Sequence, residues 1–289
     1  MIEVIGQLGW LLPAGLLVTG LCVGSFLNVV IYRLPLMLES RWRRDCCELL
    51  EVEPDAPEAP LNLASPNSHC PHCKAPIKPW QNIPVLSYLL LRGRCGNCAA
   101  RISPRYPSVE LATGLATLVL LVYMPVDTAL LGAMLFTWAL IALTMIDIDH
   151  QLLPDVITLP LLWLGLAFNI SSTYAPLADA VIGAMLGYAI LWSIYWAFKL
   201  VTGKEGMGYG DFKLLAALGA WLGWQDLHLV ILLSSVVGAA LGILLMLVKR
   251  HGREVPLPFG PYLAAAGWIT FLWGDALIAK LPFLDLGLH

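Results

Sequence analysis

Charged residues are scarce in this sequence. Asp, Glu, Lys and Arg make up only 13% of the 289 residues, whereas a soluble domain carries about 25%. Hydrophobic residues make up 58% and gather in long runs that a soluble core cannot absorb. The sequence also lacks a patch of basic residues interleaved with aromatic ones, so nucleic acid is not expected as a partner. The composition therefore predicts an all-α polytopic membrane protein that lies in the lipid bilayer.

The N-terminal segment lacks the basic residues with which a cleavable signal peptide begins. Glu3 is the only charged residue before Arg33. The apolar run from Ile5 to Ile31 is long enough, at about 1.5 Å per helical residue, to cross a bilayer of about 30 Å. We interpret this run as a first transmembrane helix that is retained. Hydropathy predicts about eight spans in the chain: 8–31, 108–124, 128–147, 155–171, 178–199, 211–224, 227–248 and 258–279.

A long polar insert separates the first two predicted spans. The sequence thus divides into a first transmembrane helix at 1–31, the insert at 32–107 and a transmembrane core at 108–289. Within the insert, Leu36–Val52 is predicted to be an amphipathic helix that lies on the membrane surface. Glu53–Pro60 is rich in proline and acidic residues, which is typical of a linker.

The distribution of basic residues orients this topology. With eight spans, the insert lies on the same side as the short segments near 147–155, 199–213 and 249–255. These four segments hold every lysine and arginine of the chain except Lys280. The positive-inside rule therefore places the insert and the three short segments in the cytoplasm.

Four of the seven cysteines form two pairs with metal-ligand spacing. Cys70 and Cys73 make one CxxC pair, Cys95 and Cys98 make the other, and 21 residues separate the pairs. Two such pairs supply the four thiolates of a tetrahedral zinc site, and cytoplasmic thiols stay reduced and free to bind metal. Four protein ligands leave no open position, so the zinc is predicted to be structural. Disulfides or redox motifs are the alternative interpretation. His69 and His72 flank the first pair as substitute ligands or as bystanders.

Two aspartates stand at the cytoplasmic ends of predicted spans. Asp147 ends one span within the segment MIDIDHQLLPD, and Asp211 begins another after the glycine-rich segment GKEGMGYG. A carboxylate at the membrane is costly, so proteins keep such groups where they pair or perform chemistry. Two facing carboxylates cannot both ionise easily, and such a pair can activate a water for hydrolysis. Two interfacial helix caps are the alternative interpretation.

The neighbouring residues are given other roles. Asp147 and Asp149 are two residues apart and point to different faces of a helix, so only one of them can face Asp211. Asp147 lies deeper and is the predicted partner, whereas Asp149 is expected to cap or bind. Asp155 opens the next span and is predicted to cap it. Glycines before Asp211, chiefly Gly208 and Gly210, would let a substrate backbone approach, unless they serve only loop flexibility.

The segments that hold these residues resemble those of the type IV prepilin peptidases, a GxGD class of membrane aspartyl proteases. The resemblance covers nearly the whole chain. Its motifs follow in the family's order: VGSFLNVVIYRLP (23–35), PNSHCPHC (66–73), WQNIPVLSY (80–88), YPSVELATG (106–114), IDIDHQLLPD (146–155), GMGYGDFK (206–213) and PFGPY (258–262). The resemblance implies that Asp147 and Asp211 are the catalytic pair and that the four cysteines belong to the family's insert.

The resemblance also implies an activity and its partners. It predicts an aspartic endopeptidase of the bacterial inner membrane that removes basic leaders from prepilins and pseudopilins, which carry a Gly before the cut and an apolar helix after it. It further implies N-methylation of the new N-terminus with S-adenosylmethionine. The methyl donor is placed in the insert by resemblance only, with Arg92–Arg94, Glu110 and Glu205 as candidates.

Two other functions compete with proteolysis. A proton- or ion-coupled transporter also uses paired carboxylates and broken glycine-rich helices, but it would hold its carboxylates near the bilayer midplane. A membrane scaffold that displays a zinc module gives no reason for an aspartate beside GMGYG. Acidic residues at the cytoplasmic boundary favour the protease.

Overall fold

The computed structural model describes residues 9–52, 61–249 and 258–280. Within these ranges the secondary structure is helical, with two isolated β-bridges and no strand. The predicted linker at 53–60 and the basic residues Arg250 and Arg253 lie outside the described residues. The all-α prediction is confirmed.

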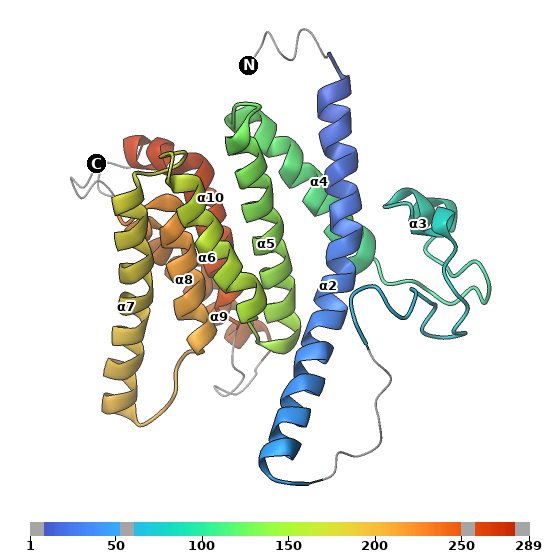
Figure 1. Ribbon diagram of the computed structural model, residues 1–289, viewed down its shortest axis with the longest axis horizontal. Helices are drawn as coiled ribbons and strands as arrows, with labels where there is room; N and C mark the ends of the chain where they lie inside the picture. Colours follow the sequence, from blue (N-terminus) through green and yellow to red (C-terminus); the bar gives the residue numbers. More distant parts are fainter. Residues whose placement is uncertain (1–8, 53–60, 250–257, 281–289) are drawn as a thin grey trace. The chain divides into compact units, whose positions relative to one another are not determined.

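The chain forms two compact units, residues 1–122 and 123–289. The first contains α2 (Leu11–Leu49), the 3-10 helix η1 (Pro79–Asn82), α3 (Leu86–Leu90) and nearly all of α4 (Arg105–Tyr123). The second contains α5 (Thr128–His150), α6 (Asp155–Asn169), α7 (Leu177–Thr202), α8 (Tyr209–Leu222), α9 (Leu227–Lys249) and α10 (Gly260–Lys280) (Figure 1). The three-part division at residues 31 and 107 stays a prediction.

Each of the eight predicted spans coincides with one of these helices. Six helices of the described chain, α2, α4, α5, α7, α9 and α10, are long and apolar enough to cross a membrane. The other two are shorter, because α6 has 15 residues and α8 has 14. The count of eight spans is therefore approximate.

The first helix is longer than predicted. Helix α2 runs without a break for 39 residues, from Leu11 to Leu49, as one continuous blue ribbon in Figure 1. The prediction of a separate amphipathic helix at Leu36–Val52 was wrong, since these residues continue the first helix up to Leu49. Pro35 lies inside α2 and removes one backbone donor without ending the helix.

Small residues bring α2 and α4 together within the first unit. A Cβ added to Gly24 would lie 2.7 Å from the Cα of Glu110, and one added to Gly20 would lie 2.8 Å from the Cα of Gly114. Close approach of backbones through glycine is the usual way in which membrane helices pack.

Helix α8 is the most buried helix of the second unit. From Asp211 to Leu222 every residue except Lys213 is buried. Helices α6, α7 and α10 pack against α8, and an added Cβ at Gly219 would collide with the backbone of Gly183 in α7. The indole nitrogen of Trp221 donates to the Leu161 carbonyl of α6 at 2.8 Å. Packing along α8 therefore fixes the position of this helix. Asp211 lies in its first turn.

Candidate active site and metal centre

Asp147 is buried near the C-terminal end of α5, with 5% of its surface exposed. The backbone N–H of Gly260, at the start of α10, donates to its Oδ2 at 3.0 Å. A Cβ added to Gly260 would lie 2.6 Å from that oxygen. Position 260 therefore has room for the Asp147 carboxylate only because it is a glycine.

Asp211 is buried in the first turn of α8, with 7% of its surface exposed. The carboxylate therefore lies at the positive end of the dipole of α8. Leu153 packs between the segments that carry Asp211 and Asp147, since it lies against both Gly210, which precedes Asp211, and Gly260, whose N–H binds Asp147. The structure thus brings the two predicted catalytic residues together in one buried site.

The other two aspartates of the segment lie outside this site. Asp149 is exposed, as its two-residue offset from Asp147 on the helix requires. The prediction that Asp155 caps α6 was wrong, because Pro154 occupies the N-cap position and no side chain caps the helix. Asp155 instead pairs with Lys213 of α8, whose Nζ lies 2.7 Å from its Oδ2. Both groups are partly exposed, so the pair contributes little stability.

The two glycines before Asp211 have different surroundings. A Cβ at Gly210 would lie 2.8 Å from the Cβ of Leu153, so packing requires glycine there. A Cβ at Gly208 would meet nothing closer than the Asp211 Oδ2 at 3.7 Å, which is ordinary contact. Packing within the protein therefore does not require a glycine at position 208. The backbone of Gly208 beside the Asp211 carboxylate is exposed.

The loop 203–208 between α7 and α8, called the glycine loop below, is tied to α7 by a charged pair that the sequence alone did not reveal. Lys199 donates to Glu205 at 2.8 Å and to the hydroxyl of Tyr195 at 3.2 Å. The hydrogen bond from Lys199 holds the pKa of Glu205 below its usual range. Glu205 thus has a partner that explains its charge, which argues against a separate role as a ligand for the methyl donor.

The four predicted cysteines come together in the first unit. The sulfur atoms of Cys70, Cys73, Cys95 and Cys98 all lie within 4.8 Å of one another. All seven cysteines of the chain are free, so the disulfide alternative is not supported. Neither His69 nor His72 belongs to the cluster, and both are exposed.

The two CxxC pairs have the same local structure. Cys70 N–H donates to the Ala75 carbonyl and Lys74 N–H to the Cys70 carbonyl. The same two bonds recur 25 residues later from Cys95 to Ala100 and from Ala99 to Cys95. Each of these two turns, called a knuckle below, is closed by one isolated β-bridge, His69–Pro76 in the first and Arg94–Arg101 in the second. This repeat aims both pairs of thiols at one point.

Hydrogen bonds and mutual proximity shift the pKa values of these thiols in opposite directions. The side-chain N–H of Asn97 donates to Cys73 and lowers the pKa of that thiol to about 6. The Ala100 backbone amide lowers the pKa of Cys98, but desolvation and the other thiols raise it to about 11. Four thiolates in so small a volume need a cation between them. The cluster is compatible with Zn²⁺ in composition and closure.

Two anchors hold the insert to the helices of its unit. Arg33 is buried in α2 and donates to the carbonyl oxygens of Asn62 at 2.9 Å and Pro66 at 2.6 Å. Glu110 of α4 accepts a hydrogen bond from the backbone N–H of Val85 at 2.7 Å. These contacts give structural roles to two charged residues, one of which, Glu110, was a candidate for the methyl donor.

Comparisons with known proteins agree with this arrangement. The family model described as the bacterial peptidase A24 N-terminal domain matches residues 18–124, and that of the type IV leader peptidase family matches residues 134–243. A prepilin leader peptidase/N-methyltransferase of Aeromonas hydrophila is 55% identical over 96% of both chains. Relatives of the same name from Pseudomonas aeruginosa (55% identical, 89% of both chains) and Legionella pneumophila (47% identical, 89% of this chain and 90% of the relative) also match.

No solved structure was found to match the chain significantly. The sequence matches nevertheless agree with the two units of the fold. The model of the N-terminal domain covers the unit with the cysteine cluster, and the leader-peptidase model covers the segments of both aspartates. With two buried carboxylates in one unit, a four-cysteine cluster in the other and relatives of more than 50% identity along nearly its full length, this chain belongs to the type IV leader peptidase family.

Proposed function

We propose that this protein removes the leader peptides of prepilins and pseudopilins at the cytoplasmic face of the bacterial inner membrane and then N-methylates the new N-terminus. The single observation that supports cleavage most directly is the buried pair Asp147 and Asp211, held by the Gly260 amide and by the start of α8. The names of the relatives supply the substrate class and the second activity. The family membership leaves the transporter alternative without support.

The proposed hydrolysis needs only the two carboxyl groups and a water. One aspartate is ionised and takes a proton from the water, whose oxygen attacks the peptide carbonyl carbon. The other aspartate is protonated and gives its proton to the carbonyl oxygen. When the carbon–nitrogen bond breaks, the first aspartate returns its proton to the leaving nitrogen. The second takes a proton from the diol, which restores both starting states.

The cofactors have separate places in this proposal. Cys70, Cys73, Cys95 and Cys98 would hold one structural Zn²⁺, which supplies folding energy to the insert and takes no part in cleavage. S-adenosylmethionine supplies the methyl group. The structure gives Arg92–Arg94 a role in the second knuckle, since Gly93 packs against Tyr88 and accepts a hydrogen bond from Ile102. We therefore assign no residues to the methyl donor.

Substitution of each aspartate tests the proposal. Purified Asp147→Asn and Asp211→Asn should each lose at least about a hundredfold of the leader-cleavage rate, because neither amide can cycle a proton. Asp149→Asn is the matched control and should keep most of the rate, since Asp149 is exposed. The masses of the products show both leader loss and addition of one methyl group. Cleavage at the wild-type rate by either of the first two variants would refute the assignment.

A further inference from the structure

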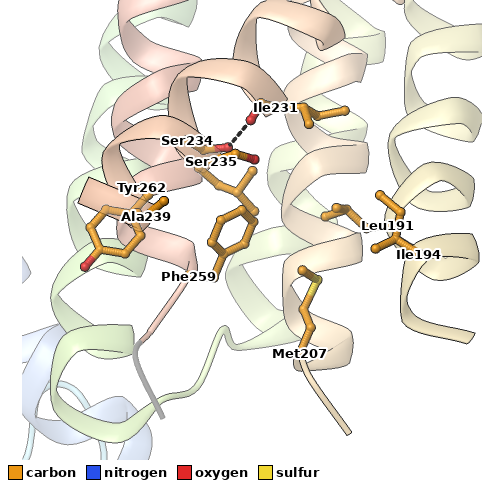
Figure 2. A pocket seen from close by; sticks show the side chains of 11 residues that line it. Leu191, Ile194, Met207, Ile231, Ser234, Ser235, Ala239, Phe259 and Tyr262 are labelled. Carbon is orange, nitrogen blue, oxygen red and sulfur yellow. Dashed lines mark hydrogen bonds between the residues drawn. The ribbon is translucent and has the colours of Figure 1, made fainter. Parts of the chain in front are cut away.

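An apolar cavity is lined in part by the two segments that contact the carboxylates. It has a volume of about 360 Å³, which is enough for a large side chain or a small ligand. Leu191 and Ile194 of α7 form one wall, and Ser235 and Ala239 of α9 form the opposite wall. Figure 2 shows the two walls with Phe259 between them and Met207 at the lower end.

Both segments that position the carboxylates line this cavity. Met207 belongs to the glycine loop and lies four residues before Asp211. Phe259 directly precedes Gly260, whose N–H binds Asp147. A molecule that fills the cavity therefore contacts Phe259, which precedes the residue that binds Asp147, and Met207, which precedes the Gly208 backbone beside Asp211. The same segments fix the position of the cavity and of the site, so their relative position is set by the fold of this unit.

The cavity has the chemistry of an apolar binding site that opens at the surface of the helical unit. Helix α7 packs on α6 and α8, and α9 packs on α10 and α8, so the cavity lies between α7 and α9. Ile194, Ser235 and Ala239 are exposed, which shows that the cavity is open between these helices. The buried hydroxyl of Ser234 donates to the Ile231 carbonyl of its own helix at 3.1 Å, so its hydrogen is already used.

We propose that this cavity binds the apolar side chain that directly follows the cleaved bond of the substrate. The inference rests on the proposed function, because it takes from it a substrate with Gly before the cut and an apolar helix after it. The exposed backbone at Gly208 can lie against the substrate glycine before the cut, because that residue has no side chain to accommodate. An apolar cavity open towards the membrane suits the other side, because the apolar helix approaches from the bilayer. The basic leader stays on the cytoplasmic side.

Filling the cavity tests this assignment. In Ala239→Phe, a ring occupies the space between α9 and α7, whereas Val236→Phe places the same ring on an exposed position of α9 that does not line the cavity. Two prepilin peptides are compared, one with Phe and one with Ala after the cut. For Ala239→Phe we expect kcat/KM on the Phe peptide to fall at least about tenfold and the Ala peptide to be cleaved nearly as by wild type. Val236→Phe should treat both peptides as wild type does.

A second measurement covers the case in which Ala239→Phe fails to fold. A prepilin peptide with a photoreactive benzophenone side chain at the position after the cut is bound to the Asp211→Asn chain in lipid nanodiscs and irradiated. We expect the crosslink at residues that line the cavity, such as Leu191, Met207, Ala239 or Phe259. A crosslink elsewhere, or equal loss on both peptides by a folded Ala239→Phe, would overturn the proposal and leave the cavity to a lipid chain. Failure of the proposed function differs from both, because wild type would then cleave neither peptide.

Discussion

The carboxylate of Asp147 is held by a backbone amide that lies 113 residues further along the chain, at Gly260. The segment PFGPY that contains Gly260 is recognisable in the sequence, but its contact with Asp147 is not. From the sequence, a glycine at this position is equally consistent with a turn. The clash between an added Cβ and the Asp147 carboxylate exists only after α5 and α10 have packed. Lys213 and Asp155, 58 residues apart, could not be paired from the sequence for the same reason.

Gly260→Ala should inactivate the protease and leave the fold largely intact. The added Cβ would lie 2.6 Å from the Asp147 Oδ2, so the carboxylate must move, and a misplaced catalytic group costs about a hundredfold in rate. Gly274→Ala is the matched control in the same helix, since its added Cβ meets Thr270 at 3.4 Å, an ordinary contact. The measurement is leader cleavage together with thermal unfolding in detergent. Equal activity of the two variants would show that the Asp147 carboxylate tolerates a Cβ at residue 260 and would contradict the requirement for glycine there.

At the scale of elements, hydropathy located the helices better than it located their ends. All eight predicted spans fall on helices, yet α2 continues from Ile31 to Leu49 through Arg33 and Pro35. Hydropathy reports where apolar surface ends, whereas a helix ends where its backbone hydrogen bonds end. Arg33 is charged but buried, because its guanidinium binds carbonyl oxygens of the insert. The charge that marked the end of the predicted span is therefore a packing residue inside a longer helix.

The cysteine knuckles show the opposite situation, in which a few residues predict a whole element. The spacing of the four cysteines is sufficient to predict one shared site, because CxxC confines two thiols to one short turn. The repeat of the knuckle backbone at a 25-residue offset also has a counterpart in the sequence, since Ala75, Ile77 and Pro79 after the first pair correspond to Ala100, Ile102 and Pro104 after the second. Lys74 and Ala99, both with positive φ, occupy the same place in the two knuckles.

The purified protein should contain one zinc per chain, bound by the knuckles. Cys73→Ser and Cys98→Ser should lose the metal, because each removes one of four thiolates that lie within 4.8 Å of one another. Cys47→Ser is the control and should keep the zinc, since Cys47 lies in α2 outside the cluster. Metal analysis by mass spectrometry measures the ratio. A zinc-free wild type whose four thiols are freely alkylated would contradict the assignment.

At the scale of the whole molecule, the two proposed chemical sites are divided between the two units. The cysteine cluster lies in residues 1–122, and both aspartates lie in residues 123–289. This division agrees with the two family models. It does not follow the boundary between polar and apolar segments, because the polar insert belongs to the same compact unit as the apolar helices α2 and α4. Hydropathy separates residues by solvent, whereas the units are defined by which side chains pack together.

The same scale decides which face of the membrane holds the site. The predicted orientation puts the segments near 147–155 and 199–213 in the cytoplasm, because every lysine and arginine except Lys280 lies on that side. The prediction depends on α6 and α8 each crossing the bilayer. Helix α6 has 15 residues and spans only about 22 Å, against a hydrocarbon core of about 30 Å. If α6 turned back, its C-terminal end would lie on the same side as Asp155.

Reporter fusions after Ser172 and after Lys204 distinguish these cases. Ser172 follows α6, and Lys204 follows α7. A reporter that fluoresces only in the cytoplasm should be active after Lys204 and silent after Ser172, whereas a phosphatase that folds only outside the cytoplasm should give the opposite result. The reason is that the loop with Ser172 holds no lysine or arginine, while the segment 199–213 holds three basic residues. Cytoplasmic activity at both sites would mean that α7 does not cross either, since α7 separates the two positions. A reversed pattern is expected if α6 does not cross or if the whole orientation is inverted, and in both cases Asp211 lies outside the cytoplasm and the proposed site of cleavage is refuted.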